Sequence, residues 1–167
     1  MDGGSLDATI RLAEPEDAFA LAALTMQDDR ECGAAIEPGF LTAYADAWLA
    51  DRHRVSFLAV APDGRPVGMV TAALVTKLPS SRRPVSSWMH VSLLFVTADA
   101  RGSGIGTALM QHLLEWGRMH AVDRVQLNAA ATARGLYRRI GFTEPDAGLM
   151  ELRLAQPHGA GQGEGGR

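Results

Sequence analysis

Short apolar runs separated by turn residues predict six strands. A run of mostly apolar residues bounded by glycine, proline or aspartate is typical of a strand. Pro62-Asp63-Gly64-Arg65 forms such a boundary, and the runs on its two sides are expected to pair as a hairpin. The predicted strands are residues 8–12, 55–61, 67–78, 88–96, 124–130 and 149–154.

Apolar residues that recur every three or four positions predict helices. Phe40, Tyr44 and Trp48 form one such stripe. Pro15 fits the first position of an earlier helix and Gly141 the end of a later one, because proline begins helices and glycine ends them. Helices are expected over residues 15 to about 26, around 40–48, 104–120 and 132–140, with a polar loop over 27–38. The order is mixed α+β, with a strand–helix–strand unit in the second half.

Composition and charge fit one globular domain. The chain has 167 residues, 47% of them hydrophobic, and a formal net charge of −3. A nucleic-acid-binding protein normally carries a basic face, so that class of function is excluded. We expect a single domain over residues 1–155 and a disordered, glycine-rich tail over 156–167, which has nothing to bury.

The cysteine count and the first residues indicate a compartment. Cys32 is the only cysteine, so no internal disulfide can form and a reducing environment is the simplest expectation. Asp2 and Asp7 stand near the start, where no apolar run suits a signal peptide or membrane span. We therefore expect a cytoplasmic protein without a membrane partner.

The glycine-rich segment that follows the predicted strand 88–96 is the most informative part of the chain. It reads Arg101-Gly102-Ser103-Gly104-Ile105-Gly106-Thr107 and opens a predicted helix. Glycines let the backbone approach a ligand closely. The first amides of a helix have no internal partner, so such a terminus binds phosphate. The sequence therefore favours a phosphate site here.

Three other interpretations of the glycines compete. The dinucleotide-binding fingerprint needs a small residue three positions after its second glycine, and neither Thr107 nor Leu109 fits. A P-loop needs a lysine after the glycines, and none follows. A plain tight turn is the third interpretation, which the segment alone does not exclude.

A second motif makes the phosphate interpretation more specific. The strand Val125-Gln126-Leu127-Asn128 precedes Leu136-Tyr137-Arg138-Arg139-Ile140-Gly141-Phe142. Together with the glycine segment, these residues resemble the GNAT superfamily of N-acetyltransferases. The resemblance implies a mixed α+β fold with a mostly antiparallel sheet of six to seven strands, whose central strands splay apart, flanked by about four helices.

The resemblance also implies a binding site for acetyl-CoA as cosubstrate. The diphosphate of coenzyme A would lie on residues 101–107, and the strand edge at Leu94, Phe95 and Val96 would hydrogen-bond the pantetheine amides. Asn128 would reach the pantetheine from the neighbouring strand, and Tyr137 would lie near the thioester sulfur. The residues assigned to cofactor binding are Leu94, Phe95, Val96, Arg101, Gly102, Ser103, Gly104, Ile105, Gly106, Thr107, Asn128 and Tyr137.

The expected reaction is direct attack of a neutral amine on the thioester carbonyl. It needs a hydrogen-bond donor for the developing oxyanion, for which a backbone N–H near Val96 is the candidate. It also needs an acid for the departing thiolate, whose conjugate pKa is about 8.5, and a phenol near 10 can supply the proton. Tyr137 suits that role. The alternative is that Tyr137 only packs against the core from its helix.

Two residues are candidates for the base that accepts the amine proton. His90 lies in the predicted strand 88–96, and strict alternation from Val96 would place it on one face with Leu94 and Ser92. A histidine titrates near pH 6.5 in the absence of perturbation, which suits a base acting through water. Glu31, in the acidic segment 28–31, is the other candidate. The plainer alternatives are that His90 is inert and that the acidic segment is merely solvated. The remaining histidines are not spaced as metal ligands, so no metal is expected.

Two functions are compatible with these features, and a third is disfavoured by them. The first is an enzyme that acetylates a primary amine of a small molecule or peptide through a ternary complex. The second is a non-catalytic module of the same fold that binds acyl-CoA. A nucleotide-dependent oxidoreductase is disfavoured by the fingerprint spacing. The amine acceptor is left open by the sequence, and a homodimer is possible.

Overall fold

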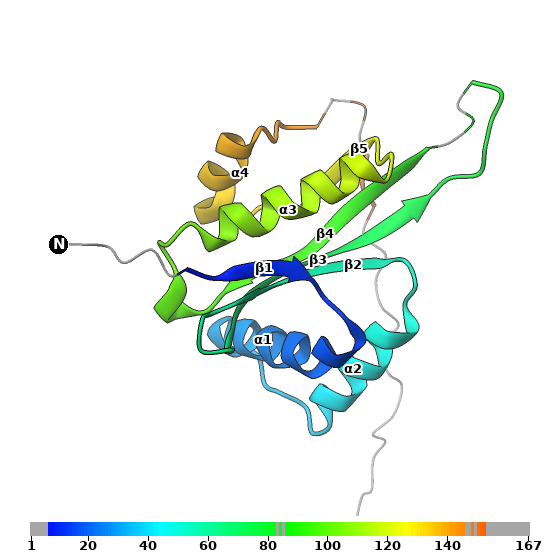
Figure 1. Ribbon diagram of the computed structural model, residues 1–167. Coiled ribbons are helices and arrows are strands. Elements are labelled where there is room, and N and C mark those ends of the chain that lie inside the picture. Colours follow the sequence, from blue (N-terminus) through cyan, green and yellow to red (C-terminus); the bar gives the residue numbers. More distant parts are fainter. Residues whose placement is uncertain (1–6, 83, 85, 146–147, 149, 153–167) are drawn as a thin grey trace, which may run out of the picture.

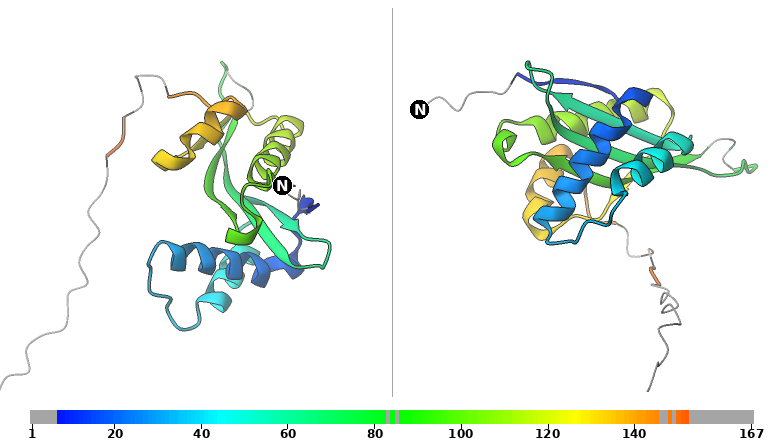
Figure 2. Two further views of the ribbon diagram at one scale, coloured as in Figure 1. Left: turned by 90° about the vertical axis from the view of Figure 1, so that its left-hand side faces the viewer. Right: turned by 90° about the horizontal axis from the view of Figure 1, so that it is seen from below.

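The structure, a computed structural model, describes residues 7–152 except 83, 85, 146, 147 and 149. It contains one sheet with the strand order β1-β2-β3-β4-β5. The strands are β1 (Thr9–Leu12), β2 (Arg54–Val60), β3 (Pro66–Thr76), β4 (Ser87–Val96) and β5 (Arg124–Leu127). The helices are α1 (Ala18–Glu31), α2 (Phe40–Ala50), α3 (Ile105–Met119) and α4 (Arg134–Ile140). Helices α1 and α2 cover one face of the sheet, and α3 and α4 cover the other (Figures 1 and 2).

The predicted fold class is confirmed. The first four strands pair antiparallel in sequence order, and β5 pairs parallel to β4 across the connecting helix α3. The described residues form five strands, fewer than the six to seven expected. The predicted strand 149–154 lies partly outside the described residues, and its described part, residues 150–152, forms no strand. The predicted tail 156–167 lies wholly outside them.

The predicted loop over residues 27–38 is wrong in its first part. Helix α1 continues through the acidic segment and ends at Glu31. Its buried residues Leu21 and Leu24 pack under the sheet, and this packing outweighs the weak helix preference of aspartate. The stop comes from Gly33, whose φ of 79° is left-handed, as is common just past a helix end.

Two apolar cores lie on the two faces of the sheet. The α3-side core contains buried residues of the helix, including Leu109 and Leu113, packed against Val91 and other strand residues. The α1-side core joins Leu21 of the helix to Phe95 of β4 and neighbouring strand residues. Within the described chain, no helix combines the length and apolar character needed to cross a bilayer.

A β-bulge at Ser92 interrupts the alternation of β4. Thr71 lies opposite Leu93 and Ala72 opposite Val91, so Ser92 is the extra residue. Val91 before the bulge and Leu94 after it both contact the α3-side core, although strict alternation would separate them. The expectation that His90 and Leu94 share a face is therefore wrong, because the extra residue reverses the phase of the side chains.

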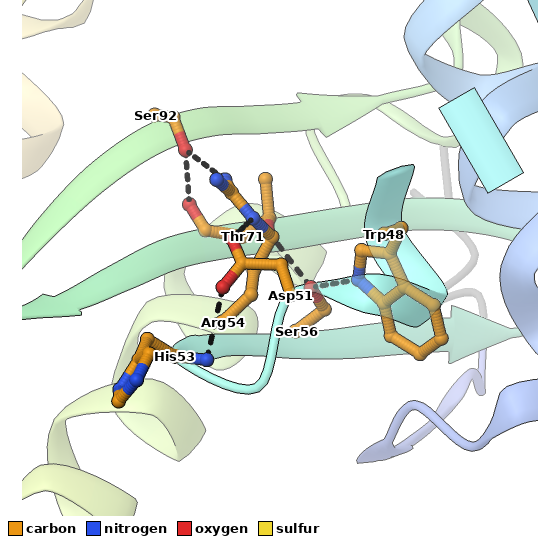
Figure 3. A network of polar contacts seen from close by, with 7 residues as sticks. All are labelled: Trp48, Asp51, His53, Arg54, Ser56, Thr71 and Ser92. Atoms are coloured by element: carbon orange, nitrogen blue, oxygen red, sulfur yellow. Dashed lines mark hydrogen bonds and ion pairs between the residues drawn. The ribbon is translucent and has the colours of Figure 1, made fainter. Parts of the chain in front are cut away.

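Polar side chains link the bulge to the centre of the sheet (Figure 3). The Ser56 hydroxyl donates to Thr71 Oγ1 over 2.8 Å and accepts a bond of 3.0 Å from Trp48 Nε1. The Ser92 hydroxyl donates to the Thr71 carbonyl and accepts from Arg54 Nη1, both over 3.3 Å. The bond between Ser56 and Thr71 is buried, and leaving such a partner unpaired costs about 1–3 kcal/mol, so this bond holds β2 and β3 in one register.

Strands β4 and β5 stay together for only four residue pairs. Their pairing runs from Trp88 with Arg124 to Val91 with Leu127. β5 ends at Leu127, whereas β4 continues to Val96 and there pairs only with β3 among the described strands. The edge of β4 after the bulge thus presents backbone N–H and C=O groups to the open side of the sheet.

Candidate active site

The glycine turn stands between the free end of β4 and the start of α3. A short 3₁₀ helix, Ala98–Ala100, follows β4 and leads into the turn. Gly102 and Gly104 have φ values of 79° and 87°, a left-handed conformation that side chains with a Cβ adopt rarely. A Cβ placed on either glycine would meet no described atom within 4 Å, so the turn borders open space. The Ser103 hydroxyl fixes the turn by donating to the Ala100 carbonyl over 2.6 Å.

The N-terminus of α3 has amides free for an anion. Gly104 is the residue before the helix, and no side chain of the described residues caps it. Ala108 N–H donates to the Gly104 carbonyl, which is the first bond of the helix. The N–H groups of Ile105, Gly106 and Thr107 precede that bond and have no partner within the helix. With the helix dipole, they form a site suited to phosphate.

The Arg101 side chain folds back from the turn onto β4. Its Nε donates to the Val96 carbonyl over 2.9 Å, and its guanidinium lies 5.5 Å from the centre of the Phe95 ring. Its Nη2 forms an ion pair with Glu31 at the end of α1. The structure thus brings together two predicted site residues, Arg101 and Glu31, that are 70 positions apart. Because the guanidinium is engaged, the backbone amides at the start of α3 are the free donors at this turn.

The acidic end of α1 creates one perturbed carboxyl that sequence reasoning missed. Asp28 is half-buried, and burial raises its pKa above the ordinary value. The nearby charges of Asp29 and Glu31 raise it further, while Arg101 opposes the shift. The run of acids over residues 28–31 is the sequence signal that could have indicated it.

Tyr137 lies half-buried on α4, over the α3-side core that Leu94 and Val96 also contact. Its ring meets Phe142 edge-on, with the ring centres 5.7 Å apart. Burial raises the pKa of the phenol, because the phenolate would be poorly solvated. The hydroxyl therefore stays protonated at neutral pH.

The other two predicted residues lie at the point where the strands separate. Asn128 is exposed and directly follows β5. His90 is half-buried in β4 opposite Gln126, one residue before the last pair between the strands. Its ring lies 6.5 Å from the Trp88 ring, on the face of the sheet away from α3. His90 and Leu94 thus flank the bulge on opposite faces.

Comparisons with known proteins agree with this geometry. Residues 21–142 match the model of the acetyltransferase (GNAT) family. An uncharacterized N-acetyltransferase of Methanocaldococcus jannaschii is 30% identical over 112 residues, which cover 65% of this chain and 48% of the relative. The match thus spans about half the length of that relative.

Solved structures share the fold. A predicted acetyltransferase from Clostridium acetobutylicum, whose crystal structure is that of the protein with acetyl-CoA, superimposes with a TM-score of 0.72 at 18% identity. The match covers 88% of this chain and 96% of that one. A ribosomal-protein-alanine N-acetyltransferase from Brucella melitensis biovar Abortus 2308 gives a TM-score of 0.68 at 26% identity, covering 89% and 99%.

Proposed function

The chain belongs to the acetyltransferase (GNAT) family, and from this premise we propose that it transfers an acetyl group from acetyl-CoA to a primary amine of a small molecule or peptide. The observation that carries the proposal is the pair of left-handed glycines before the uncapped N-terminus of α3, directly after the free edge of β4. That combination places helix N–H groups that can bind a diphosphate beside strand N–H and C=O groups. The strand groups can hydrogen-bond an extended ligand that contains amides.

The residues present fit coenzyme A in two respects. The turn at Gly102 and Gly104 borders open space, and the helix amides behind it lack partners among the described side chains. The free edge of β4, over residues 93–96, can hydrogen-bond the pantetheine amides, and Asn128 follows the neighbouring strand. When bound, acetyl-CoA supplies the activated acetyl group.

The protein's own groups supply donors for the transfer. We assign the backbone N–H groups of β4 between the bulge and Val96 to the developing oxyanion, where one such donor is typically worth ~10²-fold or more. Tyr137 holds its proton at neutral pH and is assigned to protonate the departing thiolate. The amine attacks directly in a ternary complex, so no covalent link to the protein is needed.

We assign His90 as the base that accepts the amine proton, because it lies at the last pairs between β4 and β5. Glu31 is the alternative, but its carboxylate already pairs with Arg101. His90→Ala is expected to lower kcat/KM and to remove the acid limb of its pH profile, since a protonated imidazole cannot accept a proton. The check is kcat/KM against pH for the parent and His90→Ala.

His120→Ala is a suitable control, because His120 stacks on Trp116 at the far end of α3, with ring centres 3.8 Å apart. A His90→Ala profile that overlays the parent's would exclude His90 as the base and make Glu31 the next residue to change.

A non-catalytic module that binds acyl-CoA is the alternative function. The two functions differ in whether thiol release from acetyl-CoA depends on an added amine. We expect thiol release that increases with amine concentration. The amine panel includes a peptide beginning with alanine, because the Brucella protein of similar fold is a ribosomal-protein-alanine N-acetyltransferase. Acetyl-CoA binding without amine-dependent release would support the binding module.

A further inference from the structure

One face of the sheet carries an aromatic and cationic cluster of which the proposed chemistry uses only His90. It consists of Trp88 and His90 on β4 and Arg124 and Gln126 on β5, here called the Trp88 cluster. In the register of the two strands, Trp88 lies opposite Arg124 and His90 opposite Gln126. The intervening residues of β4 point into the α3-side core, so the cluster lies on the opposite face.

The Trp88 cluster is accessible to solvent among the described residues. Trp88, His90 and Gln126 are half-buried, and Arg124 is exposed. None of the four belongs to either apolar core, whereas Phe95, further along β4, is buried against α1. The cluster therefore extends from the point where β4 and β5 separate toward the start of both strands.

The positive charge of Arg124 has no ion-pair partner among the described residues. Its guanidinium carbon lies 5.7 Å from the centre of the Trp88 ring, and no described acid is within ion-pair distance of it. A guanidinium over a ring keeps its in-plane N–H donors free. Those donors match a carboxylate, which arginine binds through two parallel hydrogen bonds.

We propose that Arg124, supported by Trp88, binds a carboxylate carried by the amine that is acetylated. The proposal rests on the proposed function, because it places the amine beside His90. Arg124 pairs opposite Trp88, two residues from His90, which corresponds to about 7 Å along a strand. The amine and the carboxylate must therefore be separated by several bonds.

That separation defines the class of acceptor. An α-amino acid carries both groups on one carbon and is too short to span the distance. An ω-amino acid such as 6-aminohexanoate is long enough, and hexylamine has the same chain without the carboxylate. These two amines thus form a matched pair that isolates the charge.

The test compares kcat/KM for 6-aminohexanoate and hexylamine in the parent and in Arg124→Gln. We expect the parent to prefer 6-aminohexanoate by about fivefold or more, as suits a charged hydrogen bond at a partly exposed site. The preference should fall toward unity in Arg124→Gln and recover in part in Arg124→Lys. Arg118→Gln, which removes the same charge from α3 on the other face, should keep it.

The proposal would be overturned if the parent protein did not prefer 6-aminohexanoate to hexylamine. It would also be overturned if Arg124→Gln kept that preference. If neither amine is acetylated, the same pair is compared by calorimetric binding to the protein saturated with acetyl-CoA. Tighter binding of 6-aminohexanoate that is lost in Arg124→Gln would then support the carboxylate site while the proposed turnover fails. Equal binding of the two amines would reject the site.

Discussion

Replacing Tyr137 by phenylalanine should lower kcat and kcat/KM together, by about 10²–10⁴, while acetyl-CoA affinity stays at the parental value. The ring keeps its edge-on contact with Phe142 and its place over the α3-side core, so the fold is retained. Only the hydroxyl is lost, and its proton is needed only as the carbon–sulfur bond breaks. Steady-state kinetics with a confirmed acceptor and calorimetric titration of acetyl-CoA measure the two quantities.

The chain offers a matched control in its other tyrosine. Tyr44 lies on α2 with its ring centre 5.9 Å from that of Phe40 and packs on the α1-side core, whereas Tyr137 packs on the α3-side core, so Tyr44→Phe removes one hydroxyl without touching the proposed acid. We expect near-parental kcat in this variant. Parental kcat in Tyr137→Phe as well would make Tyr137 a core residue and remove the acid from the mechanism.

Introducing aspartate at Gly104 should weaken acetyl-CoA binding by at least about tenfold, equivalent to ~1.4 kcal/mol. The residue precedes the free amides of α3, and a carboxylate there would compete with the diphosphate and repel it. The left-handed φ of 87° adds backbone strain, of order 1–3 kcal/mol for a residue other than glycine. Calorimetric affinity and thermal unfolding measure the two effects separately.

Gly104→Asn separates charge from strain. Asparagine has nearly the same size as aspartate and tolerates the left-handed region similarly, but it is neutral. We expect the two variants to unfold at similar temperatures and the asparagine variant to bind acetyl-CoA more tightly. Equal affinities in the two folded variants would show that the diphosphate does not approach this amide cluster.

The glycine turn and its flanking elements could be predicted from sequence because their signals are local. An apolar run ends at Val96, glycines follow, and an apolar stripe from Ile105 marks the helix, all within about 25 residues. Gly141 likewise ends α4 with a φ of 108°, as the sequence predicted. Each of these features depends on backbone preferences that neighbouring residues determine.

Features that depend on distant residues could not be predicted in this way. The bulge at Ser92 arises from pairing with β3, and nothing in the composition of β4 indicates an extra residue. The contact between Glu31 and Arg101 joins positions 70 apart and requires α1 to extend further than its polar end suggests. The stacking of Arg124 on Trp88 likewise requires the parallel register of β4 and β5.

Mass spectrometry of amines incubated with the protein and isotope-labelled acetyl-CoA tests the central claim most directly. The account predicts a labelled acetyl group on a primary amine, with one free thiol released for each acetylated product. Labelled thioester that is bound but not consumed across the amine panel would contradict the account, and so would thiol release that yields labelled acetate and no acetylated amine.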